Sequence, residues 1–404
     1  MRQRGILFLF FIMVLSGQFA LDRVDYSLER LGVLGQARVW LFLPLALWVV
    51  FSCARGARFP SFRRSSGKFF WAVFALHVYL AISALWTPRV LEASEMISNA
   101  SEVCGVLLLA ATVLMVPAIF RGDTRRKVVF FLGLVLGASI VYAIGGLFGE
   151  WREEDRVAAF GGGPNVFVRI VGMGVLVAIY FWLRTKRVVW LVPIPLLMGS
   201  AILSGSRGGI LALGIGISFL LVLSWRGIGV TLRRRAVAAC ALLILLSLSF
   251  FRQTVFPYWQ QRFVENSFED RNDSDRLLLF TEAVNLIQEN PVNGVGLDGF
   301  RRLSVLGEYS HNLFLQVTSE AGLIGLGLLL TSLIAASKAW SWTSTLEEKT
   351  LLGLGALFFF AQMFSGSYYD ARYMWIFFGL IWVLRESLAV SKPELGAVVV
   401  HAGA

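Results

Sequence analysis

The sequence has 404 residues, of which 57% are hydrophobic, and a mean hydropathy of +0.69. This composition excludes an ordinary soluble protein, because the apolar runs approach or exceed the roughly 18 to 20 residues that cross a bilayer. The formal charge of +11 would suggest nucleic acid as a partner of a soluble protein, but here Lys and Arg follow the positive-inside rule, so no nucleic-acid partner is expected.

Apolar segments recur along most of the chain. The first runs from Gly5 to Ala20 behind Arg2 and Arg4, and it is either a first membrane span or a signal peptide. Eleven more spans are expected near 31–53, 69–86, 101–120, 128–148, 164–183, 188–203, 208–225, 236–251, 311–336, 351–365 and 371–388. The pattern predicts an all-α polytopic membrane protein with about twelve transmembrane helices.

Charge supports this topology. If both termini are cytoplasmic, alternate loops should collect Lys and Arg. All six lysines fall in the loops or tail predicted to lie inside: Lys68, Lys127, Lys186, Lys338, Lys349 and Lys392. The chain is therefore expected to divide into spans 1 to 9 (residues 1–251), a periplasmic loop (252–310), and spans 10 to 12 with a cytoplasmic tail (311–404).

The long outer loop carries six Arg against nine Asp and Glu, and a loop of this length is usually functional or disordered. A helix is predicted from Ser274, a plausible N-cap, to Asn290, where Pro291 ends it. On this helix Arg276 shares a face with Phe280, Ala283, Val284 and Ile287. It is expected either to point toward the membrane domain or simply to reach water at the helix end.

Two glycine-rich outer turns carry arginines. Arg207 lies in Ser204-Gly205-Ser206-Arg207-Gly208-Gly209, where it either binds a phosphate with two parallel hydrogen bonds or snorkels to lipid headgroups. Gly161-Gly162-Gly163-Pro164-Asn165 either cradles a phosphate or is a plain turn with Asn165 capping a helix. Arg169 follows as a second cation at the membrane edge.

Metal binding and base catalysis are the other chemistries to consider. Asp273-Ser274-Asp275 resembles the aspartate pair that holds a divalent metal in many sugar transferases, but helix capping explains it equally well, and no metal or other cofactor is expected. His311 lies where the polar loop meets a span, whereas His77 is inside an apolar run and His401 is near the chain end. A histidine with an ordinary pKa near 6.5 can accept a proton from an alcohol at neutral pH. His311 is therefore the candidate base, or else a capping or interfacial residue.

Taken together, these segments resemble the O-antigen ligase and polymerase family of bacterial membrane glycosyltransferases. The segments that carry the resemblance are Leu85-Trp86-Thr87-Pro88, Gly163-Pro164-Asn165, Ser206-Arg207-Gly208, Arg276 on a loop helix, Asn290-Pro291, Gly294-Val295-Gly296, His311-Asn312-Leu313 and Glu320-Ala321-Gly322. The resemblance implies a GT-C-like, metal-independent, inverting transferase of the inner membrane with its active site facing the periplasm. Its donor would be a glycan on undecaprenyl pyrophosphate, and membrane lipids would surround it.

The resemblance also implies residue roles. Arg207 and Arg276 would bind the pyrophosphate and His311 would deprotonate the acceptor. Further candidates for substrate contact are Asn165, Arg169, Arg301, Arg302 and Asn312. The acceptor would be lipid A core for a ligase or a growing glycan for a polymerase. The single long outer loop and modest length favour the ligase. A transporter or flippase remains an alternative, although the mid-span segments are poor in polar groups.

Overall fold

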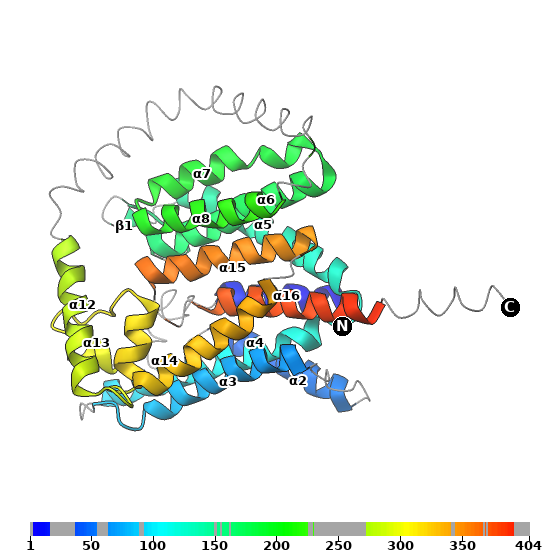
Figure 1. Cartoon of the computed structure of the whole chain (residues 1–404). Coiled ribbons are helices and arrows are strands. Elements are labelled where there is room, and N and C mark those ends of the chain that lie inside the picture. Colours follow the sequence, from blue (N-terminus) through cyan, green and yellow to red (C-terminus); the bar gives the residue numbers. More distant parts are fainter. Residues whose placement is uncertain are drawn as a thin grey trace.

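The computed structural model describes residues 3–16, 37–54, 64–88, 93–148, 152–153, 156–160, 163–224, 229, 272–340, 344–366, 368 and 371–391. These ranges are almost entirely helical (Figure 1). Six helices are long and apolar enough to cross a membrane: α3 (Arg64–Ser83), α4 (Ala93–Phe120), α5 (Thr124–Phe148), α6 (Pro164–Thr185), α8 (Arg207–Ser224) and α14 (Leu313–Trp340). The predicted class, an all-α multi-pass membrane protein, is confirmed. The count of about twelve spans stays a prediction, and the span expected at 236–251 lies outside the described residues.

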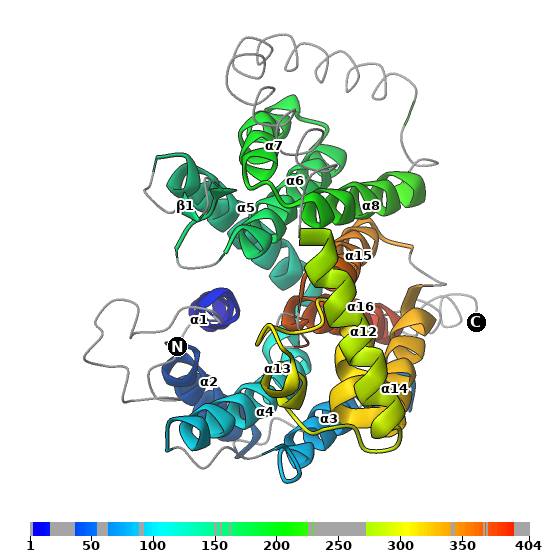
Figure 2. The same cartoon turned by 90° about the vertical axis from the view of Figure 1, so that its left-hand side faces the viewer.

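Further helices of the described ranges complete a bundle. They are α1 (Gln3–Leu15), α2 (Ala37–Ala54), α7 (Ile194–Leu203), α15 (Leu346–Phe364) and α16 (Arg372–Ser391). Figures 1 and 2 show α5 to α8 on one side of α15 and α16, and α2, α3, α4 and α14 on the other. Helix α1 packs through Phe10 against Phe120 and Phe131, so the first apolar segment is a bundle helix in this structure.

Hydrogen bonds at the two ends of the bundle agree with the predicted alternation of helix direction. At one end, the buried Glu347 of α15 accepts hydrogen bonds from Arg125 of α5 (3.0 Å), Arg184 of α6 (3.1 Å) and Tyr180 of α6 (3.2 Å). We call this the basic end. At the opposite end, which we call the site end, α6, α8 and α14 begin and α15 finishes. A buried carboxylate with three donors thus fixes the ends of α5, α6 and α15 at the basic end.

Helices α8 and α15 cross closely. A Cβ on Gly216 would lie 2.9 Å from the Gly353 carbonyl oxygen, and a Cβ on Gly353 would lie 3.0 Å from that of Gly216. Small residues at such a crossing let two helix backbones approach, as is typical inside membranes. The start of α8 is therefore held at a defined position against the end of α15.

Three local features differ from the predicted spans. The span expected at 188–203 is divided into a 3₁₀ turn, η4 (Val188–Leu191), and the short α7, because Pro193 at the N-cap has no backbone N–H to continue the first turn. A two-stranded hairpin, β1 (Arg152–Glu153) with β2 (Arg156–Val157), precedes α6. Helix α14 is broken at Gly322, whose φ is 62° and ψ −163°. None of these features has a hydrophobic signature, so periodicity alone misses them.

The loop helix is present as α12 (Asn272–Glu289), followed by the short α13 (Gly299–Leu303). It begins two residues before Ser274, which therefore lies within its first turn. Its buried stripe consists of Leu279 and Ala283, which pack with Phe300 and with the half-buried Leu286 and Leu315. Arg276 lies in helical register with this stripe, three residues before Leu279 and seven before Ala283, but its side chain is exposed, which agrees with the alternative of an arginine that reaches water at the helix end.

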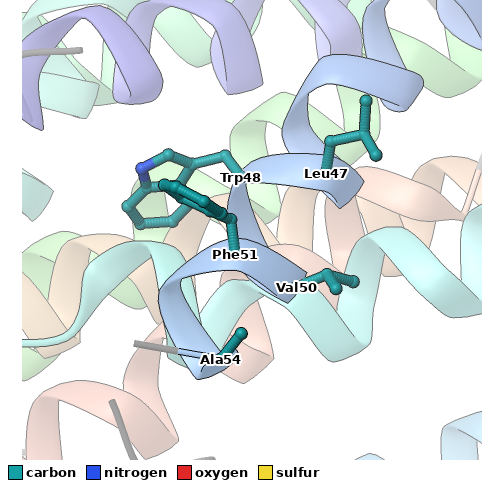
Figure 3. Close-up of a pocket in the computed structure, with 5 residues that line it drawn as sticks. All are labelled: Leu47, Trp48, Val50, Phe51 and Ala54. Atoms are coloured by element: carbon teal, nitrogen blue, oxygen red, sulfur yellow. The ribbon is translucent and has the colours of Figure 1, made fainter. Parts of the chain in front are cut away.

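The surface of α2 carries an apolar hollow. Leu47, Trp48, Val50, Phe51 and Ala54 line it, as Figure 3 shows. Leu47 and Val50 are 69% and 65% exposed, which is expected of a helix face that contacts lipid. Because the lining has no titratable or charged group, this hollow has no means of acid–base or phosphate chemistry.

Candidate functional site

The turn that leads into α8 is fastened by Asn165. The Asn165 Oδ1 accepts hydrogen bonds from Ser206 Oγ (2.7 Å) and from Arg156 Nη2 (3.3 Å). The Arg156 Nε also donates to the Ser204 carbonyl oxygen (3.1 Å). Two glycine-rich segments that are separate in the sequence thus meet, and the oxygen of Asn165 is used to hold the turn before Arg207. Sequence reasoning missed Arg156, which lies in a mixed-charge segment without a motif.

Arg207 is the half-buried first residue of α8. The next residue, Gly208, packs against the last residue of α15: a Cβ there would lie 2.4 Å from the Cβ of Phe364. The backbone next to Arg207 is therefore held against the end of α15. This places the Arg207 guanidinium, a group that can bind an anion, at the site end of the bundle.

Arg169 lies on α6, one helical turn beyond Asn165, and is only 2% exposed. Its Nη2 donates to Ser365 Oγ at 3.2 Å, immediately after α15. A Cβ on Gly366 would lie 3.1 Å from the same nitrogen, so the guanidinium lies against the backbone of this turn. Arg169 adds a buried positive charge to the site end.

His311 precedes α14 in the left-handed conformation, with φ 54°. Histidine tolerates this region better than most residues, but the conformation still costs on the order of 1–3 kcal/mol and often marks a functional position. The His311 Nε2 lies 3.1 Å from Glu308 Oε2, and the imidazole side chain is 21% exposed. A ring nitrogen next to a carboxylate and within reach of solvent is the arrangement of a general base with an orienting group. Sequence reasoning did not identify Glu308.

Asn312 connects His311 to the bundle. Its Oδ1 accepts hydrogen bonds from the backbone N–H groups of Phe314 (3.0 Å) and Leu315 (3.2 Å), and so caps α14. Its Nδ2 donates to the Met363 carbonyl oxygen at 3.4 Å. The amide of Asn312 is thus engaged by the protein, which indicates a positioning role rather than the substrate contact considered for it.

The last turn of α15 is therefore the point at which the candidate residues come together. Phe364 contacts the residue after Arg207, Met363 accepts a hydrogen bond from the residue after His311, and Ser365 binds Arg169. The fold thus brings the candidate base His311 and two arginines to one end of the bundle.

A loop at 290–298, which we call the anchor loop, fills the break in α14. Four backbone hydrogen bonds join it to both sides of the break: Leu323 N–H to Pro291 O (2.8 Å), Ile324 N–H to Val292 O (3.4 Å), Val295 N–H to Ser319 O (2.9 Å) and Gly296 N–H to Glu320 O (2.8 Å). A Cβ on Gly322 would lie 2.1 Å from the Val292 oxygen, so only glycine fits at the break. Two segments noted in the sequence, Asn290 to Gly296 and Glu320 to Gly322, are one structural unit.

The segment before Pro88 also joins the anchor loop. The Thr87 Oγ1 donates to the Leu297 carbonyl oxygen at 2.8 Å, and Arg302 Nη1 donates to the Pro88 carbonyl oxygen at 3.3 Å. The anchor loop thus connects α3, α14 and the two helices α12 and α13 outside the bundle.

Arg301 and Arg302 both pair with Asp298, a buried residue with φ 62° at the start of α13. The Asp298 carboxylate is 2.7 Å from Arg301 Nη2 and 3.3 Å from Arg302 Nε. Its hydrogen bonds raise the pKa of Arg301 above the ordinary value, so this guanidinium stays charged. The side chain of Arg302 is 10% exposed and that of Arg301 is 38% exposed. Of the two, Arg301 is therefore the more accessible to a substrate.

Arg276 is exposed near the start of α12. Figures 1 and 2 both place the N-terminal end of α12 close to the site end of α8. The side chains of Asp273 and Asp275, considered for metal binding, lie outside what the structure describes.

Residues 194–330 match the family model described as O-Antigen ligase. This segment of the chain is similar to the O-antigen ligase family. The matched segment runs from α7 past the break in α14, so it contains Arg207, Arg276, His311 and the anchor loop, whereas α6 and α15 lie outside it. No curated protein matches the chain.

Proposed function

We propose that this protein transfers a glycan from undecaprenyl pyrophosphate to an acceptor hydroxyl, with inversion and without a metal, at the periplasmic face of the bacterial inner membrane. The observation that supports this most is the meeting of Arg207, His311 and Arg169 around the last turn of α15, within a membrane bundle of which one segment is similar to the O-antigen ligase family. A transferase of this kind needs cations for the leaving group and a base for the acceptor, and side chains that can fill both roles lie at the site end.

In this proposal Arg207 and Arg276 bind the pyrophosphate. A guanidinium presents paired N–H donors that match phosphate oxygens, and its charge does not depend on pH in the physiological range. Negative charge grows on the pyrophosphate as the bond to the sugar breaks, so the two arginines stabilise the transition state more than the ground state. Electrostatic contributions of this type are worth roughly 3–4 kcal/mol per donor in a site that excludes water.

His311 takes the proton. The acceptor oxygen forms a bond to the anomeric carbon on the face opposite the pyrophosphate, the bond from that carbon to the pyrophosphate oxygen breaks, and the acceptor proton moves to the imidazole. Glu308, 3.1 Å from Nε2, holds the ring in place and stabilises the imidazolium that forms. The negative charge of the broken bond leaves with the lipid pyrophosphate. Cleavage of this activated donor supplies the free energy of transfer, so no nucleotide is needed.

For the acceptor we propose lipid A core, which makes the reaction O-antigen ligation in lipopolysaccharide synthesis. The alternative within the same family is polymerisation, in which a second lipid-linked glycan accepts the chain. Both use the same base and cations, so they differ only in the acceptor that enters next to His311.

The test is glycan transfer by the full-length protein in nanodiscs, with an undecaprenyl-pyrophosphate glycan as donor and lipid A core as acceptor. His311→Ala is expected to lower the rate by about 10²–10⁴-fold, the range of general base catalysis, and Arg207→Ala by about 10²-fold or more. His401→Ala is the matched control for the first, and Arg126→Ala, an 83% exposed side chain at the basic end, for the second.

The outcomes separate the candidate reactions. Product on the core that is lost in both variants, while a chelator has no effect, supports the ligase proposal. Lengthening of the lipid-linked glycan without core identifies a polymerase. An undiminished rate in His311→Ala, or no product with either acceptor, overturns the proposed function.

A further inference from the structure

One buried carboxylate has no part in the proposed chemistry. Glu320 is 1% exposed and lies at the end of the first segment of α14, two residues before the break at Gly322. Its Oε2 accepts a hydrogen bond from Tyr368 OH at 2.6 Å, and the carboxylate also receives one from the backbone N–H of Asp298. Its backbone oxygen is the acceptor for Gly296 in the anchor loop.

These three contacts link three separate parts of the molecule. Tyr368 lies between α15 and α16, in the turn that follows the meeting point of the candidate residues. Asp298 starts α13 and pairs with Arg301 and Arg302. Glu320 itself belongs to α14, so its carboxylate is the junction between the bundle, the broken helix and the helices outside the bundle.

The residue type fits this junction for a physical reason. Two donors, a phenol and an amide N–H, converge on the group, and a carboxyl group offers two oxygens that can accept from both. Glutamine has the same size but replaces one oxygen by a donor. Burial of a carboxylate in a membrane bundle is costly and normally marks a functional position, so an apolar residue would be expected if packing alone were required.

The geometry also indicates what the junction controls. Helix α12 runs away from the anchor loop, and at a rise of about 1.5 Å per residue Arg276 lies roughly 21 Å along the axis from Asn290. A tilt of about 10° at the anchor loop would move Arg276 by on the order of 4 Å, whereas misplacement by about 1 Å is enough to impair catalysis. The C-terminal end of α12, which the hydrogen bonds of the anchor loop fix, thus determines where Arg276 lies at the other end of the helix.

We propose that Glu320, together with Tyr368, is a positioning residue that fixes the anchor loop and thereby places Arg276 for binding of the donor pyrophosphate. The proposal rests on the proposed function in one respect, the contact of Arg276 with the donor. His311 is held independently, through Asn312 and Met363, so loss of the junction affects donor binding more than the proton transfer.

The test uses Glu320→Gln and Tyr368→Phe in the full-length protein in nanodiscs. Hydrogen exchange of residues 291–303 is expected to accelerate by about 10-fold or more in both variants. The KM for the undecaprenyl-pyrophosphate glycan is expected to rise by about 10-fold with a smaller change in kcat, the size of one lost hydrogen bond. Glu289→Gln, the same substitution at the exposed last residue of α12, is the matched control and should change neither.

Epistasis distinguishes positioning from general stability. In an Arg276→Ala background, Glu320→Gln should raise the donor KM no further, because the residue through which it acts is gone, whereas a structural defect would add to the loss. If Glu320→Gln does not fold, Tyr368→Phe decides, since it keeps the carboxylate. Unchanged exchange at the anchor loop, or an additive effect with Arg276→Ala, overturns the proposal. Hydrogen exchange needs no turnover, so it still tests the junction if no transfer is found.

Discussion

A single methyl group at Gly208 should impair transfer, because it is placed where α8 meets the last turn of α15. The Cβ of an alanine there would lie 2.4 Å from the Cβ of Phe364, whereas ordinary contacts begin at 3.4 Å. A Cβ is fixed by its backbone, so Phe364 cannot relieve the clash by rotating its ring. The two helix ends must separate.

The size of the effect follows from these distances. A separation of about 1 Å restores an ordinary contact between the two Cβ atoms, and overpacking of this kind costs roughly 1–3 kcal/mol of stability. It also moves the adjacent Arg207 by a similar distance relative to α15 and His311. Misplacement of a binding group by about 1 Å can lower a rate by about 10²-fold. We therefore expect a large loss of transfer with a moderate loss of stability.

The assay compares Gly208→Ala with Gly214→Ala, a matched control in the same helix where a Cβ would meet no atom within 4 Å. Transfer rate and thermal midpoint are measured for both in nanodiscs. Combining Gly208→Ala with Phe364→Ala should not restore activity, since alanine keeps the Cβ, whereas Phe364→Gly should restore part of it. A rate for Gly208→Ala equal to that of Gly214→Ala would refute the reasoning.

Two further predictions concern side chains near the candidate base and cations. Glu308→Gln should lower kcat by about 10-fold, because the carboxylate that orients His311 is lost. The Glu308 side chain is 61% exposed, so the thermal midpoint should not move. An unchanged kcat would show that His311 acts alone. Asn165→Ala should remove the acceptor of Ser206 and Arg156 and loosen the turn before Arg207. The donor KM should then rise, and if a wild-type KM is measured, Asn165 does not hold the turn as inferred.

The membrane architecture was predictable from the sequence because it depends on hydrophobic runs and on the distribution of charge. The expected span at 164–183, for example, is α6 (Pro164–Thr185), and that at 208–225 is α8 (Arg207–Ser224). Both begin where a glycine-rich turn ends and finish where apolar residues run out. The loop helix was also predictable, since Pro291 stops it and no glycine interrupts it.

The structure adds features that depend on contacts between distant segments. The break in α14 could not be seen, because Gly322 lies inside the segment 311–336 that was expected to be one span, and its φ of 62° is required only by the anchor loop that fills the gap. The facing of α12 was predicted only in part: Ala283 is buried as expected, but Leu279 is buried as well, because Phe300 and Leu315 outside the helix pack against it. Glu308 and Arg156 carry no local pattern, and their partners identify them.

The segments that carry the family resemblance divide into two kinds once their contacts are known. Thr87, Gly296 and Gly322 belong to segments that hydrogen bonds to backbone groups join together. The Thr87 hydroxyl donates one of these bonds, and the two glycines leave no space for a side chain. Arg207 and His311 instead present side chains at the site end, next to backbone held by Gly208 and Asn312. Substitutions in the segments that hydrogen bonds join should therefore alter the placement of α12 and change the KM for the donor. Substitutions of the presented side chains should abolish transfer while the anchor loop keeps its protection from hydrogen exchange.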